Sequence, residues 1–317
     1  MLHITNGESV SGSLRAAGIP GDTLAWTDIL HDGPVPGGLP LDALSRVRAE
    51  FLAGQGWLPF DETWDTFRRR DSALARSSAH DEVVLWFEHD LYDQLQLIQV
   101  LDWFASRDRA PVRLTAIHAA IHLGEHQPAT LAALFPSRTA VTLPQLDTGR
   151  RAWQAFTSAD PRGLESGDWT ALPHLSTALR RWLEEFPSVE NGLGRSRRQI
   201  LDLLSEQPLT PVELFISQGD LEEGAHYLGD WSFFEYLREL SHPNPAALLH
   251  DDGRPFRPYE SLRAPLVLTP FGRALAAGRA DWIQTHGIHR WLGGVIAGTP
   301  GAAWRWSGSR LVLPPDL

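Results

Sequence analysis

Short apolar runs alternate with amphipathic segments over residues 1 to about 145. The runs have the length of strands, and the segments between them repeat apolar residues every three to four positions, as helices do. We therefore predict strands at Leu2–Thr5, Thr23–Trp26, Glu82–Phe87, Val112–Ile117 and Thr139–Leu143. Helices are predicted at Ser9–Ala17, Leu41–Ala53, Asp61–Arg76, Leu91–Ala105 and Ala129–Phe135. This alternation predicts an α/β domain over residues 1–145, with a mainly parallel sheet covered by helices on both faces.

The pattern changes after residue 145. Residues 146–190 are predicted to be a helical connector, with helices at Arg150–Thr157 and Leu175–Glu185. Residues 191–317 are predicted to form a second domain, which begins with three helices and continues with two short strands around a Gly/Pro-rich hairpin. These elements are Arg197–Leu204, Thr210–Ile216, Gly229–Leu240, Ala246–His250 and Pro265–Leu268. Helices followed by a small hairpin are typical of a winged-helix-like domain.

Composition narrows the chemistry. The chain has 317 residues, with 28 basic and 39 acidic side chains and a net charge of −11, which disfavours nucleic acid as a partner. Every basic side chain is Arg, so the sequence excludes a P-loop and a lysine Schiff base. Cysteine is absent, which excludes thiol nucleophiles, disulfides and cysteine-bound zinc. Any metal would be held by His, Asp and Glu.

The first residues, Met1 to Thr5, read as a strand rather than as a basic segment followed by an apolar leader. No apolar run approaches the roughly 20 residues that span a bilayer. We expect a cytoplasmic protein that does not contact a membrane. The sequence does not indicate an oligomeric state.

The run from Glu82 to Phe87 leads directly into Glu88, His89 and Asp90, and a helix follows. Ligands of α/β proteins bind beyond the carboxyl ends of their strands, so we interpret these three residues as catalytic candidates. Asp93 and Gln94, in the first turn of that helix, are candidates for ligand binding. In the alternative interpretation Asp90 caps the helix and Asp93 interacts with its dipole.

The first strand leads into a turn in which Asn6, Gly7 and Ser9 could receive an anion such as phosphate on backbone N–H groups. The alternative is a plain Asn-Gly turn with Ser9 as the helix N-cap. His3 lies within the strand and is either a ligand-binding residue or a core histidine.

The second strand also leads into polar residues, among them Asp28, His31 and Asp32. We predict Asp28 and His31 to be catalytic if this strand neighbours the other two. Arg70, in a short arginine run, could clamp an anionic substrate with two hydrogen bonds. The alternative is a solvated helix face with local Asp pairing.

Histidines recur every fourth position at His118, His122 and His126, as on the metal-binding face of a helix. Gly124 and Pro128 disfavour a continuous helix through all three, and no His-Glu-x-x-His motif is present. We therefore do not predict a metal site there. The 13 Trp residues are interpreted as mostly core.

The N-terminal third resembles a bacterial family known as domain of unknown function 1835. The resemblance is carried by His3 to Ser9, Trp26-Thr27-Asp28, His31-Asp32-Gly33-Pro34, Arg70-Asp71 and the run from Trp86 to Gln94. Glu8 stands where the family pattern leads us to expect Asp. The resemblance implies a site at these residues and no particular reaction.

Two main functions fit these patterns. The first is an enzyme that hydrolyses, or transfers a group from, a small phosphorylated or nucleotide-like substrate. In it Glu88 or Asp28 is the base and His89 or His31 the acid. A divalent cation on Asp28, Asp32, Glu88 and Asp90 is left open. The second is a ligand-sensing or DNA-binding regulator, although the predicted Thr210–Gln218 helix carries no Arg to read bases. A protein-interaction module is a third.

Overall fold

The computed structural model describes residues 1–107, 112–222, 227–298 and 303–313. The chain divides into two compact units. Unit 1 contains Met1–Arg180 and Trp291–Val295, and unit 2 contains Arg181–Arg290 and Ile296–Leu317. No helix within the described ranges is long and apolar enough to cross a membrane.

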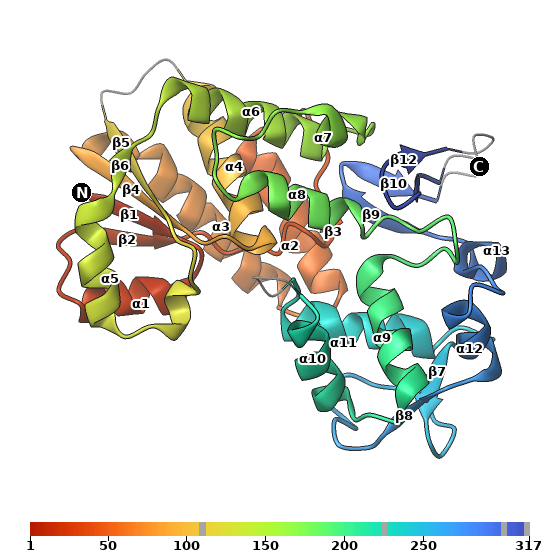
Figure 1. Ribbon diagram of the computed structural model, residues 1–317. Helices are drawn as coiled ribbons and strands as arrows, with labels where there is room; N and C mark the ends of the chain where they lie inside the picture. Colours follow the sequence, from red (N-terminus) through yellow and green to blue (C-terminus); the bar gives the residue numbers. More distant parts are fainter. Residues whose placement is uncertain (108–111, 223–226, 299–302, 314–317) are drawn as a thin grey trace. The chain divides into compact units, whose positions relative to one another are not determined.

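Unit 1 is built on a five-stranded sheet with the strand order β2-β1-β4-β5-β6 (Figure 1). The pairs β1–β2, β1–β4 and β4–β5 are parallel, whereas β5–β6 is antiparallel. The strands are β1 (Leu2–Thr5), β2 (Asp22–Ala25), β4 (Glu82–Phe87), β5 (Arg113–His118) and β6 (Thr139–Ala140). The prediction of a mainly parallel α/β sheet packed by helices is confirmed.

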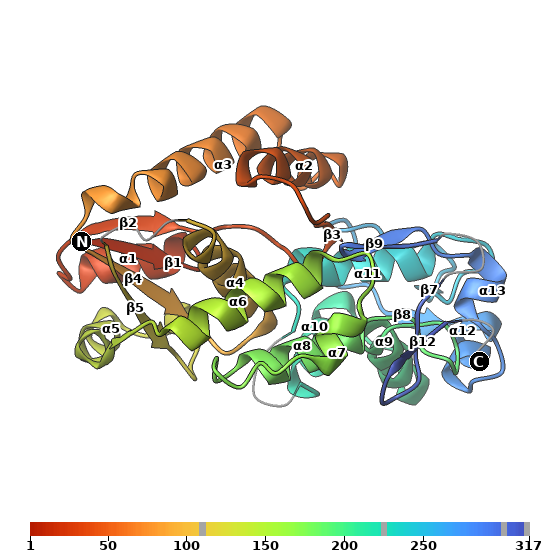
Figure 2. The ribbon, with the colours of Figure 1, turned by 90° about the horizontal axis from the view of Figure 1, so that it is seen from above.

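The central strand β4 is buried along its whole length, as its continuous apolar sequence predicts. On one side, α1 (Glu8–Ala16) and α5 (Pro128–Leu134) pack against it, and Val10, Leu14 and Leu131 contact the face that carries Val84 and Trp86. On the other side lie α4 (Leu91–Ala105) and α6 (Leu143–Thr157), which pack against each other (Figure 2). The apolar side chains of β4 are thus covered by helices on both faces of the sheet.

The remaining elements of unit 1 are a short strand, three helices, most of a fourth helix (α8) and three 3₁₀ turns. A helix pair, α2 with α3, contributes a separate small core around Ala49, Leu52 and Phe67. The bounds are β3 (Gly33–Pro34), α2 (Leu41–Gly54), α3 (Phe60–Ala75), α7 (Arg162–Ser166) and α8 (Leu175–Leu183), with short 3₁₀ turns η1 (Ser77–Ala79), η2 (Leu123–Glu125) and η3 (Phe135–Ser137).

The chain returns to unit 1 near its C-terminal end. There β9 (Arg290–Gly293) pairs in parallel with β3, and Leu292 lies opposite Gly33. The Val35 N–H donates to the Gly293 carbonyl at 2.9 Å. Residues 291–295 are therefore part of unit 1, although residues 181–290 before them belong to unit 2.

The predicted strand Thr139–Leu143 is wrong at its C-terminal end. Only Thr139 and Ala140 form a strand, and Leu143 already begins α6. Thr142 caps this helix, because its side chain accepts a hydrogen bond from the Gln145 N–H while the Gln145 side chain accepts one from the Thr142 N–H. This capping box and a proline in the first turn favour a helix start over a strand.

Unit 2 is rich in helices and contains small sheets. Its helices are α9 (Arg195–Glu206), α10 (Pro211–Asp220), α11 (Asp230–Ser241), α12 (Pro270–Ala276) and α13 (Trp282–His286). Strands β7 (Leu248–His250) and β8 (Leu266–Leu268) pair in antiparallel fashion, as do β11 (Arg305–Trp306) and β12 (Leu311–Val312). The strand β10 (Val295–Ala297) follows β9. The bounds of α9, α10, α11, β7 and β8 overlap the three helices and two hairpin strands predicted for this part of the chain.

Candidate functional site

The parallel strands of unit 1 bring three polar loops to one edge of the sheet. The chain runs from β1 outward to β2, and then crosses back to β4 on the other side of β1 before it continues to β5. Strand order therefore reverses between β1 and β4, and such a switch point is where open α/β sheets bind ligands. Asn6 follows β1 at this point and Glu88 follows β4. The two residues meet there, because the Asn6 Nδ2 donates to Glu88 Oε1 at 3.2 Å.

Glu88 is almost completely enclosed, with 3% of the residue exposed. Its Oε1 accepts a hydrogen bond from the Leu123 N–H at 2.8 Å, and its Oε2 lies 3.0 Å from the His122 Nδ1. Burial raises the pKa of Glu88, and the neighbouring Asp90 raises it further, while the bond to His122 opposes the shift. Its surroundings therefore favour the protonated form of Glu88 more than water does.

Asp90 and Asp93 sit beside Glu88 at the start of α4. Asp90 caps the helix by accepting the Asp93 N–H at 2.9 Å, as the helix-start interpretation predicts. Asp93 is fully buried, accepts the Glu88 N–H at 2.6 Å and accepts the Asn6 Nδ2 at 2.8 Å. Burial raises the pKa of both carboxyls, and for Asp93 the negative charges of Asp90 and Glu88 add to the effect. A carboxyl in this position favours its protonated form.

Glu88, Asp90 and His122 together make a set of metal-ligand atoms. One ligand atom from each of the three lies within 4.8 Å of the others. The His122 Nδ1 is 3.7 Å from an Asp90 oxygen as well as 3.0 Å from Glu88. One imidazole nitrogen and two carboxylates at this spacing suit a divalent cation, particularly Zn²⁺ or Mn²⁺, which accept mixed nitrogen and oxygen ligands.

Further histidines surround this set. The ring centroids of His89 and His122 are 5.0 Å apart, and those of His89 and His174 are 6.0 Å apart. His118 ends β5, and burial together with the nearby His174 lowers its pKa to about 4. The neutral form of His118 is therefore favoured at neutral pH. We name Glu88, His89, Asp90 and His122 the β4-edge cluster.

His31 also reaches the site from the loop after β2. Its ring centroid lies 6.5 Å from that of Tyr92 in α4, in an edge-to-face arrangement. A positive charge on His31 lowers the pKa of Asp90, which means that the two groups interact electrostatically. Gln94 faces the same turn and donates to the Glu88 carbonyl at 2.5 Å. Of the predicted residues, Asn6, His31, Glu88, His89, Asp90, Asp93 and Gln94 are brought together.

Asp28 is placed in a different environment. Arg48 donates to its carboxylate at 2.9, 3.0 and 3.1 Å, and both side chains are buried. Arg48 also donates to the carbonyls of Ile29, Asp32 and Pro34. Because the carboxylate is fully engaged with a guanidinium, Asp28 fixes the loop after β2 to α2. Sequence reasoning did not single out Arg48, since an isolated Arg on an amphipathic helix gives no signal of burial.

Arg70 and His3 are also held away from the β4-edge cluster. The Arg70 guanidinium lies 4.2 Å from the Trp26 ring centroid and donates to Ser45 and Asp71. His3 is fully buried, accepts the Trp86 indole N–H at 3.0 Å on its Nδ1, and places its Nε2 3.2 Å from the Pro20 carbonyl. These contacts match the core interpretation of His3 rather than the ligand-binding one.

The turn after β1 differs from the plain N-cap that we weighed for Ser9. Helix α1 begins at Glu8 with Gly7 as its N-cap, and no side chain caps it. Ser9 is exposed in the first turn, near Gly124 of the loop that supplies His122. The uncapped first turn of α1 therefore lies beside the segment that contacts Glu88.

His122 is the main residue that the sequence did not reveal as part of this site. Its four-residue spacing from His118 and His126 is not helical, because His118 ends a strand and His122 precedes a 3₁₀ turn. The better signal for His122 would have been its place in the short loop that follows the strand ending at His118. His126 is exposed.

No family model and no curated protein matched this chain. The resemblance to domain of unknown function 1835 stays a proposal.

Proposed function

We propose that unit 1 is an enzyme that hydrolyses a small phosphorylated substrate with the aid of a divalent cation bound at the β4-edge cluster. The observation that carries the proposal is the meeting of Glu88, Asp90 and His122 ligand atoms within 4.8 Å of one another. It occurs beside the β1–β4 switch point, where an α/β sheet binds its ligand.

The cation would be held by Glu88, Asp90 and His122. Such an ion polarises a phosphoryl oxygen and lowers the pKa of a bound water toward neutrality. Asn6 and the Leu123 N–H hold the Glu88 carboxylate in position, at 3.2 and 2.8 Å. Positioned ligands of this kind reduce the cost of organising the site when the substrate binds.

The phosphate would lie at the first turn of α1. Backbone N–H groups at a helix N-terminus carry a partial positive charge and point outward, which favours an anion. Gly7 provides no side chain that competes for those groups. The bound cation would supply the second positive charge, which offsets the repulsion between phosphate and the carboxylates.

His89 is the residue best placed to transfer a proton to the leaving group. It follows Glu88 directly, and its ring lies 5.0 Å from the His122 ring between centroids. Imidazole is the side chain most often used for proton transfer near neutral pH. Asp28, the alternative to Glu88 as the base, has no part in this proposal, because its carboxylate is bound by Arg48.

Titration calorimetry with Mn²⁺, Zn²⁺ and Mg²⁺ tests the site. Wild-type protein should bind Zn²⁺ or Mn²⁺ with one ion per chain. Glu88→Gln and His122→Asn should each weaken binding by about tenfold to hundredfold, in line with losses at other metal centres. The control His126→Asn changes an exposed histidine of the same segment and should bind as wild type does.

Activity is tested with 4-nitrophenyl phosphate and with nucleoside mono-, di- and triphosphates in the presence of the ion that binds. Turnover that requires the ion and is lost in Glu88→Gln supports the proposal. Ion binding without turnover of any phosphate ester leaves a metal site and contradicts the hydrolase. If Glu88→Gln and His122→Asn turn over the substrate as fast as wild type does, the cluster takes no part in the reaction.

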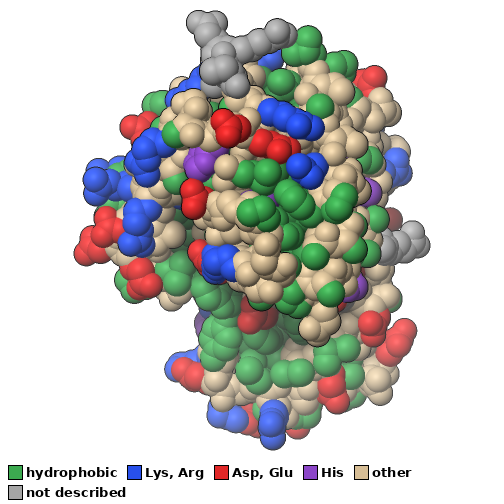
Figure 3. Space-filling model, turned by 90° about the vertical axis from the view of Figure 1, so that its left-hand side faces the viewer, with side chains coloured by type: hydrophobic (Ala, Val, Ile, Leu, Met, Phe, Trp, Pro, Cys, Tyr) green, Lys and Arg blue, Asp and Glu red, His purple; other side chains and the backbone are tan. Residues whose placement is uncertain are grey.

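For unit 2 we propose a winged-helix-like arrangement without binding to duplex DNA. The order of α9, α10 and α11 followed by the antiparallel β7–β8 pair supports the first part. The second part is supported by Arg195, Arg197 and Arg198, each of which forms an ion pair with a carboxylate of the same unit. Figure 3 shows the molecule from the side of unit 1, and there too Arg side chains are interspersed with Asp and Glu.

A further inference from the structure

The β4-edge cluster balances the charge of the ion that it would hold. Glu88 and Asp90 each contribute an oxygen to the ligand set that includes His122. Carboxylate ligands bind a metal in their deprotonated form, so their two negative charges cancel the two positive charges of a divalent ion. Both carboxylates lie within ion-pair distance of His122 and, within the part of the chain that the structure describes, of no arginine. The loaded site therefore offers a substrate no surplus positive charge.

The arginines beside the central strand lie at its other end. Arg113 and Arg138 pair with Glu82, at 4.0 and 2.9 Å. Glu82 begins β4 and Glu88 follows its last residue. A strand rises about 3.3 Å per residue, so the two positions are roughly 20 Å apart. The charges of Arg113 and Arg138 are therefore balanced by Glu82 at the opposite edge of the sheet.

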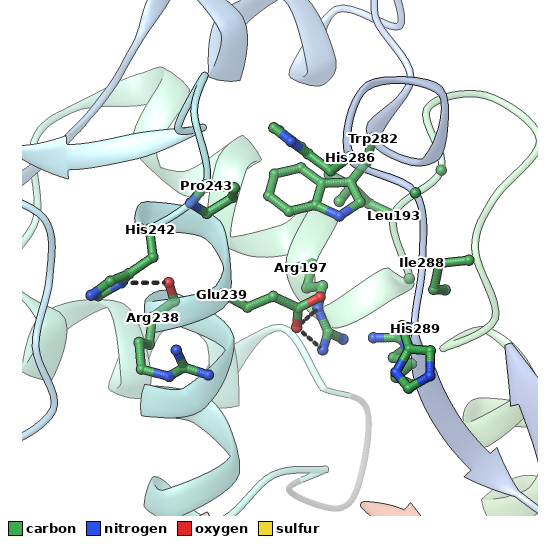
Figure 4. A pocket seen from close by; sticks show the side chains of 14 residues that line it. Leu193, Arg197, Arg238, Glu239, His242, Pro243, Trp282, His286, Ile288 and His289 are labelled. Atoms are coloured by element: carbon green, nitrogen blue, oxygen red, sulfur yellow. Dashed lines mark hydrogen bonds and ion pairs between the residues drawn. The ribbon is translucent and has the colours of Figure 1, made fainter. Parts of the chain in front are cut away.

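Other arginines are also paired with carboxylates of the chain. In unit 1, Arg48 and Arg70 are each bound by an aspartate. In unit 2, Arg197 and Glu239 pair on the wall of a cavity of about 440 Å³, as Figure 4 shows. At each of these places the positive charge is already neutralised. The cavity of unit 2 therefore gives a phosphate dianion no stronger attraction than the β4-edge cluster does.

The first turn of α1, where the phosphate would lie, contains a carboxylate of its own. Glu8 is exposed in this turn, and the Arg15 guanidinium lies 3.8 Å from it and donates to the Thr23 hydroxyl at 2.7 Å. Glu8 thus balances the arginine of the same helix. What remains is the partial positive charge of the helix N-terminus, about half an elementary charge. It can attract one negative charge and cannot compensate two.

We propose that the substrate of the β4-edge cluster is a small phosphodiester, which carries one negative charge, rather than a phosphomonoester or a nucleoside triphosphate. This inference rests on the hydrolase proposed for unit 1 and names its substrate class. Sites that bind more highly charged phosphoryl groups supply arginine, lysine or further metal ions to them. A neutral loaded cluster and a helix N-terminus suit a monoanion. The net charge of −11 disfavours a polymeric diester.

Hydrolysis of a diester forms a bond between a water oxygen and phosphorus and breaks one ester P–O bond. The water gives up one proton and the leaving oxygen gains one, which His89 is placed to deliver. The products are an alcohol and a phosphomonoester. The second pKa of a phosphomonoester is about 6, so at about pH 8 this product is a dianion. The cluster should therefore release the monoester without cleaving it again.

Turnover of bis(4-nitrophenyl) phosphate and of 4-nitrophenyl phosphate, measured with the bound ion at about pH 8, tests the proposal. The two esters share a leaving group and differ by one charge. The diester should have a kcat/KM at least about tenfold higher, because one repelled charge is absent. It should also release one 4-nitrophenolate per molecule, while ³¹P NMR shows that 4-nitrophenyl phosphate accumulates.

The outcomes separate this inference from the hydrolase itself. Equal or faster turnover of the monoester overturns the diester assignment and leaves the hydrolase standing. No turnover of either ester with the ion bound overturns both. Per phosphate, an oligothymidylate of about 20 nucleotides should inhibit diester turnover no better than a thymidine dinucleotide does. Stronger inhibition by the polymer would overturn the restriction to small esters.

A charge reversal at the first turn of α1 tests whether charge sets the preference. Glu8→Arg should raise the kcat/KM of the monoester relative to the diester by about threefold to tenfold. Glu62→Arg makes the same change at an exposed glutamate in the first turn of α3 and should leave the ratio as in wild type. Thermal melts show whether both proteins fold, and Glu8→Gln replaces a variant that does not. An unchanged ratio in the folded Glu8 variant, or an equal rise in Glu62→Arg, overturns the proposal.

Discussion

The Nδ2 of Asn6 lies 2.8 Å from the Oδ2 of Asp93, and through this bond the end of β1 is fastened to the first turn of α4. The same nitrogen donates to Glu88. We predict that Asn6→Ala lowers the free energy of unfolding by about 1–3 kcal/mol, since two buried carboxyls lose a donor. Urea unfolding measures the change. Gln127→Ala, at an exposed position, is the control, and an equal loss there would contradict the role of Asn6.

Glu88→Gln should weaken cation binding without lowering the stability of the folded protein. The amide oxygen can still accept from the Leu123 N–H, and the negative charge that faces Asp90 is removed. The free energy of unfolding should therefore change by less than about 1 kcal/mol or rise, while cation binding weakens by about tenfold to hundredfold. Thermal melts with and without Zn²⁺ measure both effects. A large loss of stability in the absence of metal would mean that Glu88 is chiefly structural.

His118 should make the protein less stable in acid. Its pKa is about 4 in the folded protein, below the value of about 6.5 for an unperturbed His, so the unfolded chain binds the extra proton. The contribution of His118 is complete above pH ~6.5 and is lost as pH falls toward 4, by up to about 3 kcal/mol. His118→Gln should lose less stability than wild type between these pH values, as measured by urea unfolding.

Three carboxyl groups have the opposite effect on how stability depends on pH. Glu88, Asp90 and Asp93 have raised pKa values, so they bind protons more tightly in the folded state and favour folding at lower pH. Because wild type and His118→Gln share these carboxyls, their contribution largely cancels in the difference. His126→Gln, at an exposed position, should follow the wild-type curve. A wild-type curve parallel to that of His118→Gln would contradict the prediction.

Breaking the Asp28–Arg48 pair should be costly. Asp28→Asn leaves a buried guanidinium without its charge partner, and we expect a loss of about 3–5 kcal/mol. The double variant Asp28→Asn with Arg48→Met should recover part of this loss, because it removes the uncompensated charge. Arg46→Ala breaks an exposed pair with Glu50 and should cost less than about 1 kcal/mol. Denaturant unfolding of the three proteins checks the order.

Duplex DNA should not bind at physiological salt. Fluorescence anisotropy with a labelled 30-mer of mixed sequence should show no salt-dependent binding tighter than about 10⁻⁴ M, the weak end of nonspecific affinity. Binding that is lost when Arg195, Arg197 and Arg198 are changed to Ala would contradict this expectation. It would favour the regulator interpretation of unit 2.

The strands and helices of unit 1 were predictable where local signals agree. The predicted bounds of β4 and α4 match the structure, because a continuous apolar run and a long helical period leave no competing pattern. Thr139–Leu143 was mispredicted because apolar Val141 and Leu143 resemble a strand, while the capping box at Thr142 acts over only three residues. Short apolar segments are ambiguous in this way.

The place of the site in the sheet was predictable, whereas the contacts between its side chains were not. Strand ends of a parallel sheet converge, which brought Asn6 and Glu88 together as expected. The partners of individual charges were not predictable, since Arg48 and His122 come from elements whose side-chain directions depend on tertiary packing. The alternation of strands and loops indicates an edge of the sheet, and it does not determine which side chains pair there.

The return of residues 291–295 to unit 1 determines how the chain responds to cleavage. A single cut near residue 180 would leave the two sides of unit 1 associated, because Gly33–Pro34 stays paired with Leu292 and Gly293 and the Val35 N–H keeps its acceptor. A protein shortened to residues 1–180 would expose the backbone groups of β3 that β9 covers, and an unpaired strand edge promotes aggregation. Removal of unit 2 therefore requires three cuts, at the boundaries after residues 180, 290 and 295, and unit 1 can be produced whole only if its two sequence segments are rejoined.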